Sequence, residues 1–345
     1  MKSAIFMKRA IFEYNSPFVL ESGQVLENLE ICYHYTDNIS EGKEVIWVCH
    51  ALTANSNPLE WWSDLVGEGK LFDTRRYTVI CANVLGSCYG SSGPASFKDS
   101  GDRYLLSFPE VTVRDTVRAH NLLREHLGIK NIDLILGGSI GGFQALEWGI
   151  IYPDVVKNIV LIACNARVSP WGTAFNESQR MALFADSSFE EQRDLYGGKA
   201  GLAAARSIAL LSYRSVLGYG LTQKESDDDT IFAQRACSYQ QYQGKKLVDR
   251  FDAYSYYTLT KSIDSHNVGR GRGGVEEALK KVIANTLIIG IDSDLLFPIE
   301  EQKYLHSKIE GSGFEQISSE FGHDGFLLEW ERIETAIKKH IKFLN

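Results

Sequence analysis

The chain contains 345 residues, of which 44% are hydrophobic and 23% are charged, as in ordinary folded enzymes and unlike disordered or collagen-like sequences. Its 36 lysines and arginines against 44 aspartates and glutamates give a formal charge of −8, which excludes a general basic surface for nucleic acid or an anionic membrane. No apolar run approaches the roughly 20 residues that span a bilayer, so we expect no membrane-embedded segment.

The beginning of the chain, MKSAIFMKRAIFEYNSP, does not resemble a signal peptide, because Lys8, Arg9 and Glu13 interrupt its apolar residues. The six cysteines lack C-x-x-C spacing, and at least three of them fall in apolar runs. We therefore expect a cytoplasmic protein with reduced, buried cysteines and neither a disulfide framework nor a zinc site. The cysteines are Cys32, Cys49, Cys81, Cys88, Cys164 and Cys237.

Short apolar runs alternate with helical patterns along the chain. Because these runs are apolar on both faces, they are typical of strands in a parallel sheet that helices cover on both sides. The predicted strands cover 44–50, 77–85, 132–138, 158–164 and 285–292, and FEQIS (314–318) is also strand-like. The predicted helices cover 111–127, about 142–152 and about 327–343.

The segment 168–282 interrupts this alternation, because it contains only helical and polar patterns. So long a stretch between two sheet strands predicts a helical insertion rather than a linker. We therefore predict one α/β core, formed by 1–167 and 283–345, that carries a helical lid at 168–282. The sequence GRGRGG (269–274) matches the G-x-G-x-x-G dinucleotide fingerprint, but no strand precedes it, so we interpret it as a loop.

The sequence LILGGSIGGFQALE (134–147) contains a G-x-S-x-G pattern between a predicted strand and a predicted helix. This is the nucleophile elbow of α/β-hydrolase sheets, in which small residues allow a sharp turn that exposes the serine hydroxyl. Ser139 is therefore the candidate nucleophile. Cys88, in GSCYG (86–90), is a weaker rival, because the glycine and proline that follow prevent a prompt helix whose N-terminus would lower the pKa of the thiol.

A serine nucleophile needs a histidine as its base, and in this architecture the histidine follows the serine and the acid in chain order. His323 is the candidate, because the loop FGHDG (321–325) lets an imidazole project freely before the last helix. His306 and His340 lie in helical patterns, and His266 belongs to the lid or its exit loop.

The carboxylate that orients the base is expected at the end of the strand that precedes it. Asp292 and Asp294 both lie there, and Asp294 is preferred because it lies beyond the strand, in a turn. The oxyanion hole is expected from the backbone N–H groups of Ile140, after the nucleophile, and Leu52, in the loop after an earlier strand. His50, which lies upstream of the serine, is expected to orient that loop.

Seven blocks spread over nearly the whole chain resemble, in order, the homoserine O-acetyltransferase family of α/β-hydrolase-fold acyltransferases. They are HALTANS, ANVLGSCYGSSGP, GGSIGGFQALEW, NESQR, GLAAARSI, IDSDLLFP and FGHDGFL. The resemblance implies an α/β-hydrolase fold with an inserted lid, and acetyl transfer from acetyl-CoA to the hydroxyl of L-homoserine in methionine biosynthesis. It also implies a cytoplasmic homodimer, with acetyl-CoA as a co-substrate and no other cofactor or metal.

The resemblance also suggests roles for individual residues. Ser139, Asp294 and His323 match the triad. Arg206, in AAARS, and Asp324 match contacts to the carboxylate and the amine of the amino acid, which suits a bidentate guanidinium and an ammonium-binding carboxylate. The implied reaction is a double displacement through an acetyl-serine intermediate, with the lid excluding water.

Several alternatives stay open at this stage. The donor is acetyl-CoA or succinyl-CoA, the acceptor is homoserine or serine, and water is the acceptor if the protein is a serine esterase on the same fold. Arg180, in NESQR, and Arg214 are further cationic candidates near the lid. The residues that bind CoA are not assigned, because the chain contains no P-loop motif.

Overall fold

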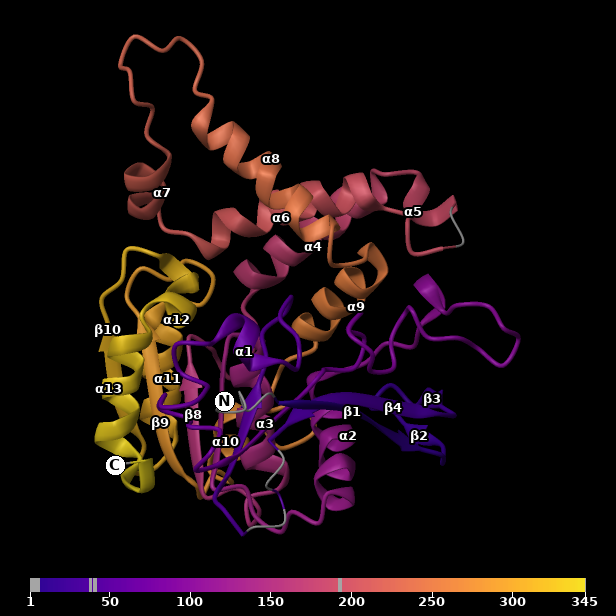
Figure 1. Ribbon diagram of the computed structural model, residues 1–345, viewed down its shortest axis with the longest axis vertical. Coiled ribbons are helices and arrows are strands. Elements are labelled where there is room, and N and C mark those ends of the chain that lie inside the picture. Colours follow the sequence, from indigo (N-terminus) through magenta and orange to yellow (C-terminus); the bar gives the residue numbers. More distant parts are fainter. Residues whose placement is uncertain (1–6, 37–38, 40–41, 192–193, 345) are drawn as a thin grey trace, which may run out of the picture.

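The computed structural model describes residues 7–36, 39, 42–191 and 194–344, which form a sheet with helices on both faces (Figure 1). The sheet of these described residues has eight strands in the order β1-β4-β6-β5-β7-β8-β9-β10. Strands β5 to β10 pair in parallel, whereas β4 pairs antiparallel with both β1 and β6. The strands are β1 (Lys8–Tyr14), β4 (Leu29–Tyr35), β5 (Val45–Cys49), β6 (Thr78–Ala82), β7 (Leu134–Gly138), β8 (Asn158–Ile162), β9 (Asn285–Ile291) and β10 (Gly313–Ile317).

The five predicted strands are present as β5 to β9, and the strand-like FEQIS forms β10. Strands β1 and β4 escape prediction because charged and polar residues interrupt their apolar runs; β1 (KRAIFEY) is the edge strand, and β4 (LEICYHY) lies between β1 and β6. A separate two-stranded ribbon, β2 (Phe18–Val19) with β3 (Val25–Leu26), lies beyond this edge (Figure 1).

The sheet has a hydrophobic core on each of its faces, as a parallel sheet between two helical layers requires. In β7, Leu134 and Leu136 point into one core and Ile135 points into the other. The first core contains residues of α13 (Trp330–His340), and the second contains residues of α2 (Val113–His126) and α3 (Ile140–Ile151).

The predicted helices differ from the observed ones mainly at their ends. Helix α3 begins at Ile140, two residues before the predicted start, because the chain enters the helix directly after Ser139. The prediction of one final helix at 327–343 is wrong: α12 (Gly325–Leu328) and α13 are separated by a bend at Glu329, where φ is −89° and ψ is 40°. The bend lets α12 pack Phe326 under the turn at Gly138 while α13 covers the sheet.

The segment 168–282 contains seven helices and no strand among its described residues, which omit 192–193. Helices α4, α6 and α8 pack on one another and lie together beyond the sheet (Figure 1), and α9 packs on α4 below them. Helix α10 instead packs against α11 (Ile299–Lys308) of the core. The helices are α4 (Pro170–Phe184), α5 (Ser188–Glu191), α6 (Lys199–Tyr213), α7 (Val216–Gln223), α8 (Arg235–Val248), α9 (Ala253–Asp264) and α10 (Val275–Leu279).

The chain enters and leaves this helical layer through a short paired neck, residues 166–168 and 266–268. The N–H of Val168 donates to the carbonyl of His266 at 3.1 Å, and the N–H of Val268 donates to the carbonyl of Ala166 at 3.0 Å. The two connections therefore lie side by side although about a hundred residues separate them in sequence. The GRGRGG stretch follows the neck as a series of turns, which agrees with the loop interpretation.

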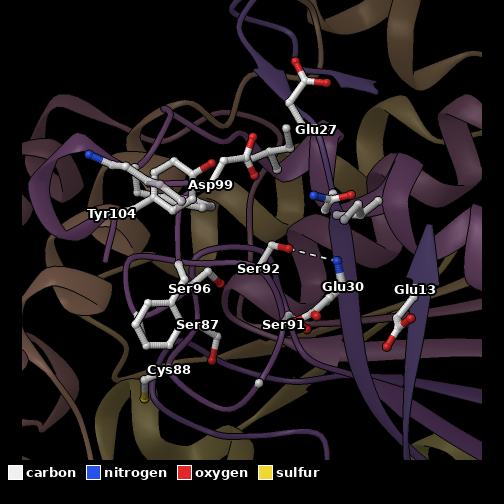
Figure 2. A pocket seen from close by; sticks show the side chains of 18 of the residues that line it. Glu13, Glu27, Glu30, Ser87, Cys88, Ser91, Ser92, Ser96, Asp99 and Tyr104 are labelled. Atoms are coloured by element: carbon white, nitrogen blue, oxygen red, sulfur yellow. Dashed lines mark hydrogen bonds between the residues drawn. The ribbon is translucent and has the colours of Figure 1, made fainter. Parts of the chain in front are cut away.

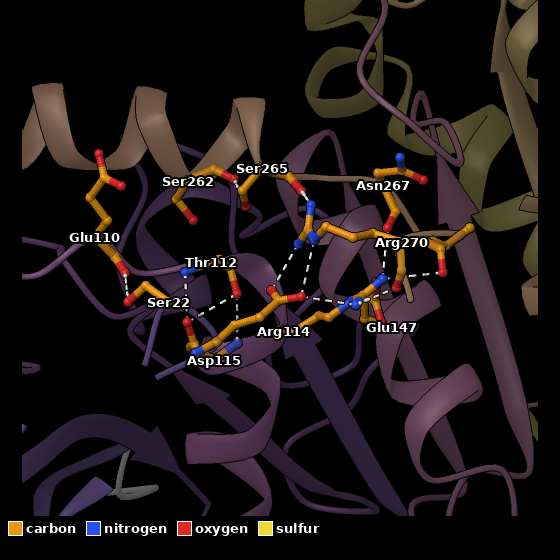
Figure 3. Close-up of polar contacts among 12 residues, drawn as sticks. Ser22, Glu110, Thr112, Arg114, Asp115, Glu147, Ser262, Ser265, Asn267 and Arg270 are labelled. Atoms are coloured by element: carbon orange, nitrogen blue, oxygen red, sulfur yellow. Dashed lines mark hydrogen bonds and ion pairs between the residues drawn. The ribbon is translucent and has the colours of Figure 1, made fainter. Parts of the chain in front are cut away.

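A cluster of ion pairs ties the loop after the neck to the core (Figure 3). Glu147 of α3 is 1% exposed and pairs with Arg114 of α2 at 3.1 Å and with Arg272 at 2.8 Å. Glu21 pairs with Arg114 at 2.9 Å and with Arg270 at 2.8 Å. Since burial of a lone carboxylate is costly, the two arginines offset the cost of burying the Glu147 side chain.

The cysteines form no disulfide in the described part of the chain. Cys32, Cys49, Cys81 and Cys164 are buried as predicted, but Cys88 is half-buried. The prediction of a buried thiol is wrong for Cys237, which lies on an exposed face of α8. None of the described helices is long and apolar enough to cross a membrane.

Replacing Glu147 by alanine should lower the free energy of unfolding by about 3–5 kcal/mol, because it leaves two arginines without their buried partner. The midpoint and slope of urea denaturation measure this loss. The matched control is Glu277→Ala, which removes the solvent-exposed pair with Lys280 and should have a far smaller effect. Equal effects of the two substitutions would contradict a stabilising role for the buried cluster.

Candidate active site

Ser139 lies in a sharp turn between β7 and α3. Its φ of 59° and ψ of −129° are strained for a residue with a side chain, as expected at a nucleophile elbow. The turn is possible only with small neighbours: a Cβ atom on Gly137 would lie 2.4 Å from the backbone of Gly141, and a Cβ on Gly141 would lie 2.3 Å from the carbonyl oxygen of Cys49. The start of α3 therefore lies directly against the end of β5.

His323 and Asp294 form a buried pair. His323 lies in the 3₁₀ turn Gly322–Asp324, and its Nδ1 lies 2.7 Å from Oδ2 of Asp294. The other oxygen of Asp294 accepts the N–H groups of Leu296 and Phe297, at 2.8 and 3.0 Å. The carboxylate is thereby held in one orientation, which selects the imidazole tautomer protonated at Nδ1.

Asp292, the alternative acid, lies elsewhere: its carboxylate accepts the N–H of Ser319 at 3.0 Å. The other histidines after the serine also have separate partners. His266 is stacked on Phe143 and donates to the carbonyl of Asn165, and burial lowers its pKa to about 3. His306 contacts Ser312, and His340 contacts Glu315.

The pKa of His323 results from opposing effects. Burial disfavours the imidazolium and lowers the pKa, but the charge and hydrogen bond of Asp294, together with the charge of Asp324, outweigh it and raise the pKa above 6.5. The other nitrogen, Nε2, is buried and has no hydrogen-bond partner among the described residues. A neutral His323 therefore offers a free lone pair to a proton donor.

Ser139 and His323 line the same cavity, which has a volume of about 590 Å³. Its wall also includes Arg206 and Arg214 of the α6 region and Asp324, which forms an ion pair with Arg214 at 3.0 Å. Arg206 lies over the ring of Tyr213, 5.4 Å from its centroid. The cationic candidate Arg180 is not among the residues of this wall, because it is buried against Glu177 and Asp264.

A second, much smaller cavity of about 20 Å³ is also lined by Ser139. Its lining is mainly apolar and includes Leu52, Phe143, Leu296 and Phe297 as well as Ser139. A space of this size holds about one water molecule or one methyl group.

The loop 50–54, which follows β5 and which we call the oxyanion loop, lies beside Ser139. Neither the N–H of Leu52 nor that of Ile140 donates to an acceptor within the described residues. Nδ1 of His50 donates to the carbonyl of Ala51 at 2.8 Å, and Nε2 accepts the N–H of Val84 at 3.0 Å. Burial lowers the pKa of His50 to about 4, so this imidazole is neutral and orients the loop.

Cys88 is a poor alternative nucleophile in this environment. Burial raises the pKa of its thiol to about 12, and the chain continues from it in turns and bends rather than a helix. Cys88 borders a larger cavity of about 830 Å³ near β1 and β4 (Figure 2). The lining of that cavity includes Glu13, Glu27 and Asp99 and several serines. No histidine lines it among the described residues, so it lacks an imidazole base.

The strained serine, the free imidazole nitrogen and the parallel sheet define a protein of the α/β-hydrolase class with a candidate Ser-His-Asp site. The family model described as alpha/beta hydrolase fold matches residues 44–329. The crystal structure of esterase E22 has a TM-score of 0.88 over 98% of this chain and 100% of that one, at 22% identity, and so supports the fold alone.

Full-length relatives define the family more closely. A homoserine O-acetyltransferase of Cyclobacterium marinum is 42% identical over 336 residues, 97% of this chain and 95% of the relative. The crystal structure of a homoserine O-acetyltransferase from Staphylococcus aureus is 31% identical, with a TM-score of 0.80 over 98% of this chain and 96% of that one. The chain belongs to the homoserine O-acetyltransferase family.

Motif reasoning on the sequence identified Ser139, His323 and Asp294 as candidates, and the structure brings Asp294 and His323 together and gives Ser139 and His323 one cavity. It missed Tyr89, Lys246 and Arg250, which also line that cavity. Tyr89 lies in a turn, Lys246 lies in α8 and Arg250 follows α8. A single sequence contains no pattern that distinguishes such residues from ordinary surface residues.

Incubation with p-nitrophenyl acetate should acetylate Ser139, and the rate should rise with pH through the raised pKa of His323, because only the neutral imidazole accepts a proton. Asp294→Asn should slow acetylation about 10⁴-fold. It should also move the midpoint to lower pH, because burial then acts without the carboxylate.

Stopped-flow absorbance and peptide mass spectrometry measure the rate and the modified residue. Ser139→Ala is the control and should give no adduct. An adduct that persists on Cys88 in this variant would contradict the assignment.

Proposed function

We propose that this protein is a homoserine O-acetyltransferase that transfers the acetyl group of acetyl-CoA to the hydroxyl of L-homoserine, as a step of methionine biosynthesis. The full-length similarity to relatives of that name supports the proposal. The observation that carries it is the cavity in which Ser139 and His323 share a wall with Arg206 and Asp324, since this arrangement combines a nucleophile and a base with charges that suit an amino acid.

The reaction is a double displacement through acetyl-Ser139. Nε2 of His323 takes the hydroxyl proton as Oγ of Ser139 attacks the thioester carbonyl, and the proton passes to the CoA thiolate when the C–S bond breaks. Nε2 then takes the proton of the homoserine hydroxyl, whose oxygen attacks the acetyl ester. The acyl bond to Oγ breaks, and Ser139 recovers its proton. The N–H groups of Leu52 and Ile140 stabilise the oxyanion in both halves.

Arg206 is the proposed ligand of the homoserine carboxylate. Within the described residues no carboxylate lies within ion-pair distance of its guanidinium, which leaves its N–H groups available for a bidentate contact. Asp324 is the proposed ligand of the ammonium. Burial raises the pKa of Asp324, the charges of Arg214 and Arg206 oppose this shift, and the ion pair with Arg214 fixes its orientation.

The small cavity beside Ser139 supports acetyl-CoA rather than succinyl-CoA as the donor. A space of about 20 Å³ suits the methyl of an acetyl group. No lysine or arginine is among its described lining residues, so the second carboxylate of a succinyl group lacks a cation there.

Exclusion of bulk water is needed for transfer to outpace hydrolysis of the acetyl-serine. We assign this role to the segment 168–282, because Tyr213 and Arg206 of its α6 region line the cavity above the serine. This division into a core, formed by 1–167 and 283–345, and a lid is part of the proposal.

A homodimer is also proposed. Helices α7 and α8 and the loop between them project from the molecule (Figure 1) and expose Val216, Ile231 and Phe232, which are 84%, 85% and 75% accessible. Large apolar side chains exposed on a projecting segment are typical of an association site, and in a symmetric dimer each copy covers those of the other. We also propose a cytoplasmic location, which the free cysteines support.

A matrix of donors and acceptors tests the function: acetyl-CoA and succinyl-CoA, each with L-homoserine, L-serine and water. We expect CoA release to depend on acetyl-CoA and L-homoserine together. Arg206→Ala should raise the KM for homoserine about 10- to 100-fold, because it removes a charge-assisted contact. Thiol release, followed with a chromogenic disulfide, measures each rate.

Equal turnover with water as the acceptor, and no response to Arg206→Ala, would support an esterase instead. A preference for succinyl-CoA would overturn the proposed donor.

Replacing Ile231 and Phe232 by aspartate should convert the dimer to a monomer, because charges then face one another across the apolar contact. Light scattering coupled to size-exclusion chromatography measures the mass. Val19→Asp, on a ribbon far from α7 and 52% exposed, is the control and should leave the dimer intact. A wild-type protein that is monomeric at micromolar concentration would refute the dimer.

A further inference from the structure

One side chain joins the helical layer to the oxyanion loop. Arg250 lies just after α8 and reaches across the cavity mouth, where its Nη1 donates to the carbonyl of Thr53 at 2.5 Å and to the hydroxyl of Tyr89 at 2.8 Å. Its Nη2 lies 3.4 Å from Oγ1 of Thr53. All three acceptors are uncharged, and no carboxylate forms an ion pair with Arg250 among the described residues.

The rest of the oxyanion loop is held from inside the core. Nε2 of Gln144 donates to the carbonyl of His50 at 3.1 Å, and the carbonyl of Ala51 accepts both Nδ1 of His50 and the N–H of Ala54. The carbonyl of Ala51 and the N–H of Leu52 belong to one planar peptide unit. Contacts that orient this carbonyl therefore orient the proposed oxyanion donor.

The other half of the turn depends on Arg250. Among the described residues, every polar contact of Thr53 comes from this guanidinium. The N–H of Ala54 donates to the carbonyl of Ala51 and closes the turn. A rotation of the peptide between Thr53 and Ala54 moves this N–H and therefore disturbs the peptide that carries the Ala51 carbonyl and the Leu52 N–H.

The base of Arg250 is firmly placed although its side chain is exposed. The adjacent Phe251 is buried and packs edge-on against Tyr89, with ring centroids 5.6 Å apart. Asp252 caps α9 by accepting the N–H of Ser255 at 2.7 Å. These contacts fix the backbone of Arg250 at the junction between α8 and α9.

We propose that Arg250 is a positioning residue that sets the direction of the Leu52 N–H by holding Thr53, and so makes the oxyanion hole depend on the lid. The inference rests on the proposed function for the role of Leu52, but it concerns the acylation step with any acetyl donor. A guanidinium suits this task because its planar fork donates to several acceptors in fixed directions, whereas the three donors of an ammonium rotate about one bond.

The test compares Arg250→Met and Arg250→Lys with Lys245→Met, which removes an exposed cation of α8 that forms no hydrogen bond with the oxyanion loop among the described residues. Two acetyl donors are used: acetyl-CoA with L-homoserine, and p-nitrophenyl acetate, which has no CoA portion. Thermal unfolding checks that each variant is folded.

With both donors, Arg250→Met should lower the acylation rate about 10- to 100-fold with little change in KM, because the lost interaction acts on the transition state. Arg250→Lys should recover part of the rate, and Lys245→Met should match the wild type. Tyr89→Phe should have a smaller effect that is not additive with Arg250→Met, since both act through one guanidinium.

The proposal would be overturned if Arg250→Met left the rate with p-nitrophenyl acetate unchanged and raised only the KM for acetyl-CoA. Arg250 would then be a contact to CoA. No effect with either donor would overturn it as well. Failure of the wild type to use homoserine would refute the proposed function, whereas the comparison with p-nitrophenyl acetate would still test Arg250.

Discussion

The close approach of α3 to β5 is the constraint on which the rest of the site depends. Gly141 lies so near the carbonyl of Cys49 that a Cβ atom has no room between them. The same approach fixes where the oxyanion loop leaves β5 relative to Ser139, because Cys49 is the last residue of that strand. Backbone packing therefore fixes where the start of α3, next to the proposed nucleophile, lies relative to the end of β5.

Around this fixed turn, the chain brings together segments that are far apart in sequence. The proposed acid and base, Asp294 and His323, follow β9 and β10, after the helical layer, whereas Ser139 and the oxyanion loop come before it. The helical layer contributes Arg206, Arg214, Lys246 and Arg250 to the cavity wall, whereas Asp324 comes from the core. In the proposed function the core therefore provides the acyl chemistry and the ligand of the ammonium, and the helical layer provides the ligand of the carboxylate.

Much of this arrangement follows from the sequence, because parallel strands have continuous apolar runs and the elbow has a short motif. The antiparallel strands β1 and β4 do not follow, because β1 is a largely exposed edge strand and because a glutamate and a histidine interrupt the apolar residues of β4. The bend at Glu329 depends on packing of Phe326 against the elbow, a contact between distant residues that no local pattern encodes. The contacts of Arg250 could not be predicted for the same reason. Its partners are distant in sequence, and the residues around it are typical of any helix end.

The paired neck at 166–168 and 266–268 has a consequence for how such a protein diversifies. Because the two connections are already joined to each other, the intervening helices form a closed loop whose ends do not move apart, and lengthening it adds little to the entropy of closure. Such a loop behaves as an exchangeable cassette. A helical layer from a relative, cut and rejoined at the neck, meets the same two hydrogen-bonded ends and the same sheet, which makes the neck the natural boundary for building chimeric enzymes.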